Sequence, residues 1–295
     1  MSVGKTGSRP SLKQLITDGT FIIAPGVYDG LSAKIADQLG FHALYMTGYG
    51  MAASRLGVPD AGIATYNDML DGLRCVCSAT HTPVIADADT GYGGLLNVRT
   101  TVRGFEAAGA AAIQLEDQEI PKKCGHTDGR RVIPIDDMVM KVRVAVDSRD
   151  SDETLIIART DSRTALGLDE ALRRAEAYAA AGADILFVES PESIEELEKI
   201  GASLDTPVLA NMVPGGGRTP DVSAERLQQF GFSMAIYPGI GFCAASHAVG
   251  TAYAYLREHG SVIGLELPLS NVNEMHTLMG FEEVWEFERK FGQRD

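Results

Sequence analysis

A cysteine with basic neighbours is the feature of this chain that most directly indicates chemistry. Cys124 lies in the segment EDQEIPKKCGHTDGRRVIP, whose prolines, glycines and many charged residues predict an exposed loop. A cysteine that only fills a core is not expected beside Lys122, Lys123 and His126. These cations favour a thiolate at Cys124 or let its thiol deliver a proton, and Gly125 allows the loop to close. The loop therefore predicts catalytic roles for Cys124, His126 and Lys123.

Two acidic residues at the end of the apolar run VIADAD indicate a metal site. Side chains alternate along a strand, so Asp87 and Asp89 point the same way. Two carboxylates on one rim suit Mg²⁺, which accepts few protein ligands, keeps waters and leaves positions for substrate oxygens. Glu116, at the end of the next strand-like run, is placed to bind a coordinated water. The alternative is that these acids cap helices or form ion pairs after the strands.

A single arginine ends the apolar run LIIART. An unpaired cation at this position is costly, so Arg159 requires a carboxylate partner. Glu189, which ends another apolar run, is one candidate and would make a structural ion pair. A substrate carboxylate held bidentately by the guanidinium is the functional alternative.

An internal repeat positions these residues. In four segments a helix ends at a glycine and an apolar strand follows at once: QLGFHALYMT, AAGAAAIQLED, AAGADILFVES and QFGFSMAIYP. The strand-like runs FIIAP, VIADAD, LIIART and VLANM interleave with helical stretches such as 97–108, 134–149, 168–181 and 223–230. Eight alternating units in about 240 residues predict a closed (β/α)8 barrel of the TIM type. A doubly wound open sheet is the alternative.

The active site of such a barrel forms at the carboxyl ends of its strands. The polar residues at these predicted ends are Thr47, Gly48, Tyr49, Asp87, Asp89, Glu116, Asp117, Arg159, Asp161, Glu189, Asn211 and Tyr237. The segment after the first strand, APGVYDG, is not a G-x-G-x-x-G fingerprint, so nicotinamide chemistry loses its main support.

Composition limits the partners and the compartment. The 295 residues are 45% hydrophobic and carry a formal charge of -14, which opposes binding to nucleic acid or anionic lipid. The four cysteines show no disulfide framework, and no apolar run reaches the roughly 18 residues of a membrane span. The first residues lack the apolar stretch of a secretory signal, so we expect a cytoplasmic protein.

The last part of the chain needs a surface to cover. We predict a barrel domain over residues 1–260 and a helical extension over 261–295. The extension contains apolar residues at helical spacing, including Met275, Leu278, Met279, Phe281, Val284, Trp285 and Phe287. They pack either on their own barrel or on another subunit.

The motifs D-A-D-T-G-Y-G, Q-L-E-D and K-K-C-G-H together resemble the isocitrate lyase / phosphoenolpyruvate mutase superfamily, from about Phe21 to Tyr255. The resemblance implies that Asp87 and Asp89 bind Mg²⁺, with Mn²⁺ as a possible substitute. It also implies that Asp60 and Glu116 support the ion. Members are commonly tetramers that exchange C-terminal helices, so the resemblance also implies a homotetramer with a swapped extension.

The resemblance assigns further roles by position. Cys124 matches the general acid, and Tyr45 matches an active-site tyrosine of the lyases. The substrate-binding positions are Thr47, Gly48, Tyr49, Gly125, Arg159, Glu189 and Asn211. The family often has serine where Thr47 stands. The general base stays open between Tyr45, Glu189 and a metal-linked water.

The implied reaction is cleavage of the C2–C3 bond of a 2-hydroxy acid to a 2-oxo acid and a carboxylic acid. The chain is too short for an isocitrate lyase, which leaves the branch acting on 2-methylisocitrate, on 2,3-dimethylmalate or, by hydrolysis, on oxaloacetate. Methylisocitrate lyases carry an arginine for the third carboxylate where this chain has Cys243. We therefore favour a dicarboxylate such as a 2,3-dialkylmalate. The alternatives are oxaloacetate hydrolysis, phosphonate-type phosphoryl transfer and a barrel that only binds a ligand.

Overall fold

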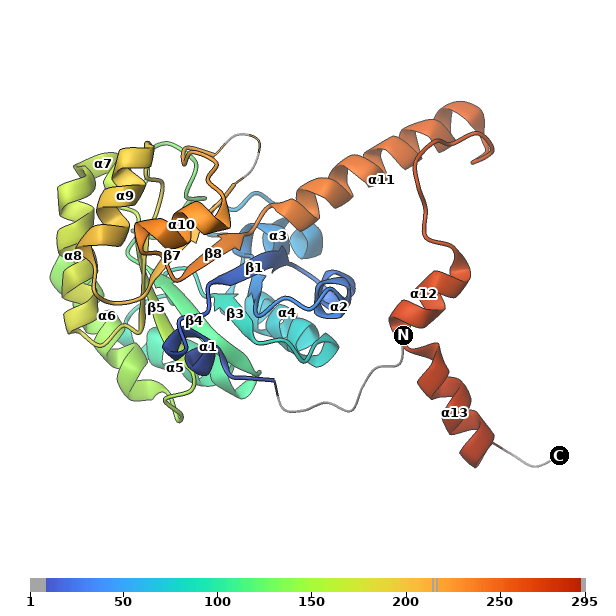
Figure 1. The fold of residues 1–295 in the computed structure, drawn as a ribbon, viewed down its shortest axis with the longest axis horizontal. Helices are drawn as coiled ribbons and strands as arrows, with labels where there is room; N and C mark the ends of the chain where they lie inside the picture. Colours follow the sequence, from blue (N-terminus) through green and yellow to red (C-terminus); the bar gives the residue numbers. More distant parts are fainter. Residues whose placement is uncertain (1–8, 214, 216, 293–295) are drawn as a thin grey trace. The chain divides into compact units, whose positions relative to one another are not determined.

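Eight parallel strands form a closed barrel in a computed structural model of the chain, which describes residues 9–213, 215 and 217–292. The strands are β1 (Ile22–Val27), β2 (Leu44–Met46), β3 (Val84–Asp87), β4 (Ala110–Glu116), β5 (Leu155–Thr160), β6 (Ile185–Val188), β7 (Val208–Asn211) and β8 (Met234–Tyr237). Each strand pairs with the next, and β8 pairs with β1 (Figure 1). In this closing pair, Met234 is opposite Ile22. This confirms the (β/α)8 barrel, and the alternative of an open sheet is wrong.

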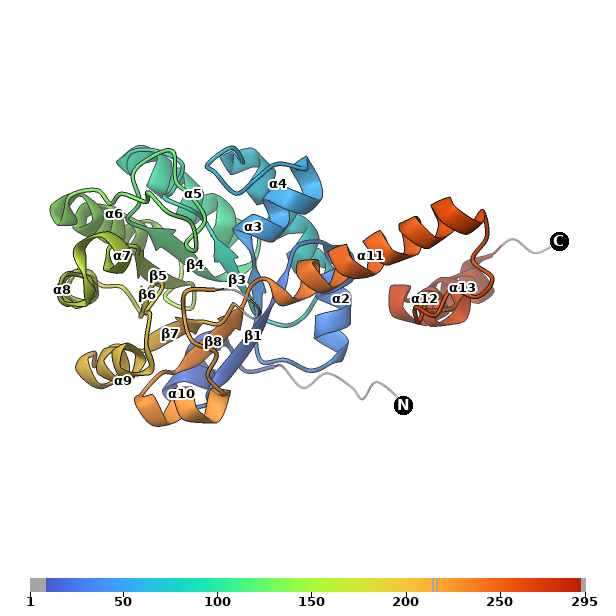
Figure 2. The same ribbon diagram turned by 90° about the horizontal axis from the view of Figure 1, so that it is seen from above.

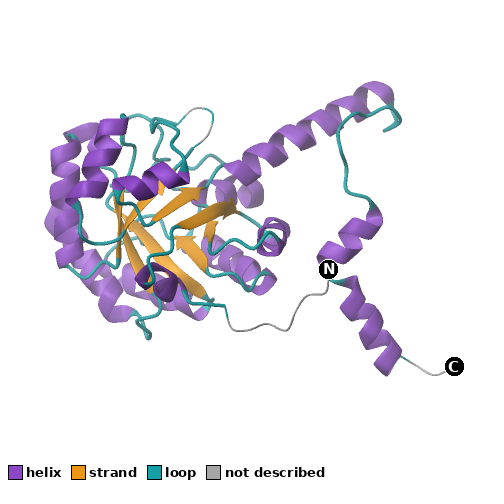
Figure 3. Cartoon of the chain, viewed as in Figure 1, coloured by secondary structure: helices purple, strands orange, loops and turns teal. Residues whose placement is uncertain are grey.

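Helices form a layer around these strands (Figures 2 and 3). They are α1 (Leu12–Thr17), α2 (Gly30–Gln38), α3 (Gly48–Met51), the π-helical turn η1 (Ala52–Leu56), α4 (Tyr66–Ala79), α5 (Leu95–Ala107), α6 (Ile135–Ser148), α7 (Arg163–Leu166), α8 (Leu168–Ala180), α9 (Ile194–Ser203) and α10 (Ala224–Phe230). The four helices predicted by number, now α5, α6, α8 and α10, are confirmed to within two residues at each end.

The repeated glycine has the conformation that the sequence predicts. Gly231 ends α10 in the left-handed region with φ of 102°, and a Cβ placed on it would lie 2.6 Å from the carbonyl oxygen of Gly201. Only glycine fits both demands. Each repeat can therefore end a helix and begin the next strand within a few residues.

The strands are apolar because both of their faces are buried. In β5, Ile157 packs inside the barrel with Ile85 and Phe187, whereas its neighbour Ile156 packs outward among the helices. At the amino end of the barrel, α1 adds Leu12 to the inner cluster. Because the interior is filled with apolar side chains, the polar residues are left to the ends of the strands.

The chain divides into two compact units, Met1–Phe242 and Cys243–Asp295. Helix α11 (Ile240–His259) begins before this division, and α12 (Val272–Met279) and α13 (Phe281–Phe291) follow it. The predicted domain boundary after residue 260 lies just beyond the end of α11, not at this division, and stays a prediction. Among the described residues, no helix combines the length and the apolar character needed to cross a bilayer.

Candidate active site

Polar side chains gather where the strands end. Asp87 is the last residue of β3 and Glu116 the last of β4, while Arg159 lies one residue before the end of β5. Glu189 follows β6 directly, and Asn211 ends β7. All five side chains are buried, although they are charged or polar. Such burial is costly unless the groups pair with one another or with a ligand.

A lysine of the loop lies among the acids. The Lys122 Nζ is 2.5 Å from Asp60 Oδ1 and 2.6 Å from Asp89 Oδ1. Burial raises the pKa of Asp89 to about 6, and the charges of Asp87 and Asp60 add to this while Lys122 opposes it. Burial alone would lower the pKa of Lys122, but the charges of Asp89 and Glu116 hold it well above its ordinary value. Asp60, Asp87, Asp89 and Glu116, which we call the acidic group, are therefore rich in negative charge and attract a cation.

Asp87 is held by three hydrogen bonds. Its Oδ2 accepts from the Gly48 N–H at 3.1 Å, and its Oδ1 accepts from the Asp89 N–H at 3.1 Å and from Gln114 Nε2 at 3.3 Å. A Cβ on Gly48 would lie 2.6 Å from Asp87 Oδ2, so residue 48 must be glycine. Gln114 in turn accepts a hydrogen bond from the Tyr45 hydroxyl at 2.8 Å. The sequence assigned no role to Gln114, which links Tyr45 to the acidic group.

These residues fit a hard divalent cation. Asp87 and Asp89 come from one strand end, and the lysine between Asp60 and Asp89 shows that a positive charge is favourable there. Within the described residues, no three histidine, cysteine or acidic side chains converge as a complete metal shell. Mg²⁺ uses one or two carboxylates and several waters, so the oxygen ligands of Asp87 and Asp89 suit Mg²⁺ rather than Zn²⁺, which prefers nitrogen and sulfur ligands.

Arg159 pairs mainly with a residue that the sequence did not offer as its partner. Its Nε and Nη2 donate to the two oxygens of Asp161 at 2.9 and 2.8 Å, whereas Glu189 Oε2 is 3.3 Å and Glu116 Oε2 3.4 Å away. The expected Arg159–Glu189 pair is thus present but secondary. Because one edge of the guanidinium is occupied by Asp161, Nη1 is the nitrogen left for a substrate carboxylate.

Cys124 lies over this site on the loop between β4 and α6. Its N–H donates to the Asp60 carbonyl oxygen at 3.1 Å, which ties the loop to the acidic group. Burial raises the pKa of the half-buried Cys124 thiol, and the Asp60 charge adds to this, while a hydrogen bond from the His126 backbone opposes it. Of the two possibilities raised for this cysteine, burial favours the protonated thiol.

The two residues after the cysteine pack on the strand ends. A Cβ on Gly125 would collide with Arg159 Nη2 and lie 2.9 Å from Glu189 Cδ, so glycine is needed for the loop to approach. His126 Nδ1 accepts from the Arg218 N–H at 3.2 Å, and its Nε2 is 3.3 Å from Asn211 Nδ2 and 3.6 Å from Glu189 Oε1. Burial lowers the pKa of His126, which leaves the ring neutral with its proton on Nε2.

Lys123 is not part of this group. Its side chain is exposed and reaches the Gly129 carbonyl oxygen at 3.5 Å, while Lys122 takes the buried position. A signal for this choice was present in the sequence. In an extended segment, residues two apart face the same side, so Lys122 shares a side with Cys124 and Lys123 faces away.

The segment from Thr47 to Tyr49 is only partly free to bind a ligand. The Thr47 N–H donates to the Val27 carbonyl oxygen at 3.1 Å, and the Gly48 N–H is used by Asp87. Tyr49 is exposed, with its ring centroid 5.2 Å from that of Phe242. The backbone N–H groups of Thr47 and Gly48, two of the three predicted substrate-binding positions here, therefore already have protein partners.

Comparison with known proteins agrees with this geometry. A family model described as phosphoenolpyruvate phosphomutase matches residues 12–257. The chain is 43% identical to a 2,3-dimethylmalate lyase of Eubacterium barkeri over 280 residues, 95% of this chain and 96% of the relative. It is 39% identical to a 2-methylisocitrate lyase of Aeropyrum pernix over 272 residues, 92% of this chain and 87% of the relative. A solved structure of oxaloacetate acetylhydrolase with 3,3-difluorooxalacetate superposes with a TM-score of 0.91 at 35% identity, covering 97% and 98% of the two chains.

Proposed function

This chain belongs to the phosphoenolpyruvate mutase/isocitrate lyase superfamily and is a carbon–carbon lyase, and we propose that it cleaves the C2–C3 bond of a small 2-hydroxy dicarboxylate with Mg²⁺ as cofactor. The observation that carries the proposal is the link between the cysteine loop and the acidic group. Cys124 is anchored to the Asp60 backbone, and the Asp60 carboxylate shares Lys122 with Asp89. The proposed proton donor and the proposed cation-binding residues thus lie together at the carboxyl end of the barrel.

Asp87 and Asp89 would hold the ion, with Asp60 and Glu116 in support. A bound Mg²⁺ supplies Lewis acidity, which lowers the pKa of a substrate 2-hydroxyl and stabilises the developing carbonyl. Lys122 would keep part of the acidic group neutralised and leave Asp87, which no lysine contacts among the described residues, open to the ion. Mn²⁺ is expected to substitute because it accepts the same oxygen ligands.

The substrate would be oriented by Arg159 and Asn211. Arg159 Nη1 offers a charged hydrogen bond to one carboxylate, and Phe187 supports the guanidinium with its ring centroid 5.1 Å from Cζ. Asn211 and the neutral His126 also lie beside Glu189 and would offer polar hydrogens to the second carboxylate. Gly125 closes the site above them and excludes water.

The bond-breaking step needs a base at the hydroxyl and an acid at the departing carbon. As the 2-hydroxyl loses its proton, its electron pair forms the carbonyl and the C2–C3 bond breaks. The electrons pass to C3, where the adjacent carboxylate accepts them as an enolate. The Cys124 thiol then transfers its proton to C3, and the thiolate recovers the proton taken by the base.

Tyr45 does not suit the role of the base. Burial raises the pKa of its hydroxyl well above the ordinary value, and the hydroxyl donates to Gln114. Glu189 is then the remaining side-chain candidate. It accepts from the Ser190 N–H at 2.8 Å and from Asn211 Nδ2 at 3.1 Å, which fixes its carboxylate beside Arg159.

A 2,3-dialkylmalate is the substrate class that we favour. The relative with 43% identity is a 2,3-dimethylmalate lyase, and Cys243 offers no cation for a third carboxylate. Hydrolysis of oxaloacetate to oxalate and acetate is the second candidate, because a structure of oxaloacetate acetylhydrolase superposes with a TM-score of 0.91.

A substrate screen tests this proposal. Malate analogues with zero, one or two methyl groups, 2-methylisocitrate and oxaloacetate would be incubated with the full chain and Mg²⁺. Release of 2-oxo acid would be followed with lactate dehydrogenase, and oxalate by ion chromatography. We expect fastest release from the dimethyl compound and no release in EDTA. Oxalate from oxaloacetate alone would favour the second candidate, and no product from any compound would favour a binding protein.

We also propose that the protein is a cytoplasmic homotetramer. The side chains Met279, Phe281, Val284, Trp285, Phe287 and Phe291 of α12 and α13 are exposed on the C-terminal unit. Another subunit would bury them, as in a swapped extension. All four cysteines are free thiols, which suits a reducing compartment. Light scattering of the full chain should give four times the mass of 31.5 kDa, and a monomer would contradict this assignment.

A further inference from the structure

Two neighbouring arginines in the cysteine loop have opposite environments. The Arg130 side chain is buried, whereas that of Arg131 is exposed and pairs with Glu119 at 2.7 Å within the same loop. Burying a guanidinium in a loop is costly, so Arg130 must be compensated by contacts outside the loop. The resemblance to known lyases and the sequence motifs assigned it no role.

Arg130 contacts the residue that follows β5 and a residue of helix α7. Its Nη1 donates to Asp161 Oδ1 at 2.6 Å, and its Nη2 donates to Thr164 Oγ1 at 2.7 Å. The same Oδ1 of Asp161 accepts from Arg159 Nη2 at 2.8 Å, and Oδ2 accepts from Arg159 Nε. One carboxylate is therefore shared between an arginine of the loop and the arginine proposed to bind the substrate.

A second contact holds the loop beside its catalytic cysteine. Ser190 Oγ, at the end of β6, donates to the Gly125 carbonyl oxygen at 2.8 Å. The Ser190 backbone has φ of 58°, an uncommon conformation for a residue other than glycine. This conformation places the hydroxyl between Gly125 and Glu189, whose Oε1 is 3.1 Å away. Arg130 Nη2 lies 3.5 Å from the same hydroxyl.

We propose that Arg130 and Ser190 are positioning residues that latch the Cys124 loop shut, and that Asp161 couples this closure to the orientation of Arg159. When the loop closes, Arg130 takes one oxygen of Asp161 and restrains the carboxylate that aligns Arg159. Closure of the proton donor over the site and alignment of the substrate arginine are then one event. The catalytic consequence rests on the proposed lyase function, but the latch itself does not.

The latch can be tested without substrate by the reactivity of Cys124. The full chain would be treated with iodoacetamide at fixed pH, and alkylation of Cys124 would be followed by peptide mass spectrometry. Cys75, which is exposed, provides the reference rate within the same molecule. Arg130→Ala should increase the Cys124 rate relative to Cys75 by on the order of tenfold or more, because it leaves a buried Asp161 without one partner. Arg131→Ala is the matched control and should leave the ratio within about twofold.

Two further variants separate a latch from general loss of structure. Ser190→Gly keeps the backbone conformation and removes only the hydroxyl, so the Cys124 rate should rise about fivefold, as for one lost hydrogen bond. Arg130→Lys keeps the charge but not the two-pronged geometry, and should give an intermediate rate. Equal rates in wild type, Arg130→Ala and Ser190→Gly, with unchanged circular dichroism, would overturn the latch.

Steady-state kinetics then test the coupling to Arg159. With the substrate found in the screen, Arg130→Ala should raise KM as well as lower kcat, because both the carboxylate site and the proton donor are displaced. A fall in kcat with unchanged KM would overturn the coupling. If wild type cleaves no compound while Arg130→Ala still exposes Cys124, the lyase proposal fails and the latch stands.

Discussion

Acidic side chains at the two ends of the barrel have different surroundings. At the amino end, Asp37 accepts hydrogen bonds from Thr80 Oγ1 at 2.7 Å, Thr82 Oγ1 at 2.7 Å and the His81 N–H at 3.1 Å, and Arg9 pairs with it. At the carboxyl end, Asp60 and Asp89 share a single lysine. The Asp37 carboxylate has enough hydrogen-bond donors around it, whereas Asp60 and Asp89 carry more negative charge than their one lysine neutralises.

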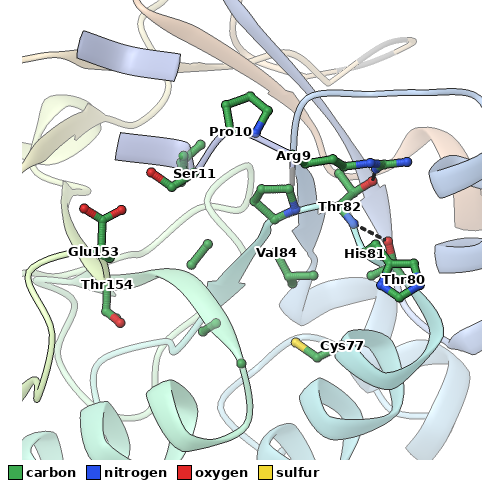
Figure 4. Close-up of a pocket in the computed structure, with 15 residues that line it drawn as sticks. Arg9, Pro10, Ser11, Cys77, Thr80, His81, Thr82, Val84, Glu153 and Thr154 are labelled. Carbon is green, nitrogen blue, oxygen red and sulfur yellow. Dashed lines mark hydrogen bonds between the residues drawn. The ribbon is translucent and has the colours of Figure 1, made fainter. Parts of the chain in front are cut away.

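Cavity size does not distinguish the two ends, because the cavity lined by Asp89, Tyr92 and Lys122 at the carboxyl end measures about 360 Å³. A cavity of about 370 Å³ lies beside the amino ends of β3 and β4, between residues such as Arg9, His81 and Glu153 (Figure 4). Its principal hydrogen bonds already connect protein groups, as the Thr82 N–H does to Thr80 Oγ1 at 2.9 Å. The difference teaches that unsatisfied charge, rather than empty volume, indicates the end of the barrel that does chemistry.

The largest expected effect is at the carboxyl end, at the proton donor. Cys124→Ser should lower kcat by about 10³-fold or more, because a hydroxyl is a far weaker acid than a thiol. Mg²⁺ affinity, measured by isothermal titration calorimetry, should stay nearly intact. Full activity in this variant would remove Cys124 from the mechanism. It would also weaken the assignment of the chemistry to the carboxyl end of the barrel.

The two lysines of the cysteine loop, one buried and one exposed, allow a comparison within the carboxyl end. Lys122→Ala removes the only cation that contacts Asp60 and Asp89 in the described chain, and should lower kcat/KM by about 10²-fold, the loss of roughly 2.7 kcal/mol of stabilisation. Lys123→Ala, with an exposed side chain, should change it less than about twofold. An equal fall of kcat/KM in both variants would show that the total charge of the loop matters and that the burial of Lys122 does not.

Asp89→Asn tests whether the negative charge of Asp89 destabilises the folded protein when no cation is bound. Asparagine tolerates the positive φ of 48° at this position, so the backbone should be unaffected. Activity should fall, but in EDTA the variant should not unfold more easily than wild type at pH 7. The folded pKa of Asp89, about 6, is above its unfolded value, so ionisation costs stability as pH rises through this window.

Urea unfolding in EDTA at several pH values measures this effect. The stability of Asp89→Asn relative to wild type should increase between about pH 4 and pH 6 and then level off. A relative stability that falls over the same range would mean that the ionised Asp89 is stabilised by its partners, as Asp37 is at the other end.

The smallest effect on activity is expected at the amino end. Asp37→Asn should leave kcat/KM unchanged and lower the free energy of unfolding by about 1 kcal/mol, because the amide cannot satisfy all the donors around it. Burial raises the pKa of Asp37, but hydrogen bonds from Thr82, Thr80 and the His81 backbone, together with the charge of Arg9, lower it by more. This stabilisation is therefore present above about pH 4 and lost in more acidic solution. A loss of activity without loss of stability would contradict a purely structural role.

The barrel and its polar rim were predictable from the sequence because they depend on local patterns. A glycine that ends a helix and an apolar run that follows it, as at Gly182, repeat with enough regularity to predict alternating strands. Since the carboxyl ends of parallel strands meet at one end of a barrel, the sequence alone was enough to group Asp87, Arg159 and Asn211.

The partners within the rim were less predictable because they join residues that are far apart in the chain. The Arg130–Asp161 pair spans 31 positions, and no local pattern distinguishes Arg130 from Arg131. The sequence offered Glu189 to Arg159 because both end apolar runs, but Asp161, two residues after Arg159, reaches the guanidinium more closely. The buried lysine was missed because the loop was treated as uniformly exposed.

The origin of the proton on the departing carbon tests the central claim most directly. Cleavage of 2,3-dimethylmalate in D₂O by the wild-type chain would give pyruvate and propionate, and the propionate would be analysed by NMR after coupling to a chiral auxiliary. We expect one deuterium at C2 in a single configuration, because the exchanged thiol of Cys124 delivers it from one side. Racemic propionate would contradict the account, since it would show that solvent and not a positioned acid ends the reaction.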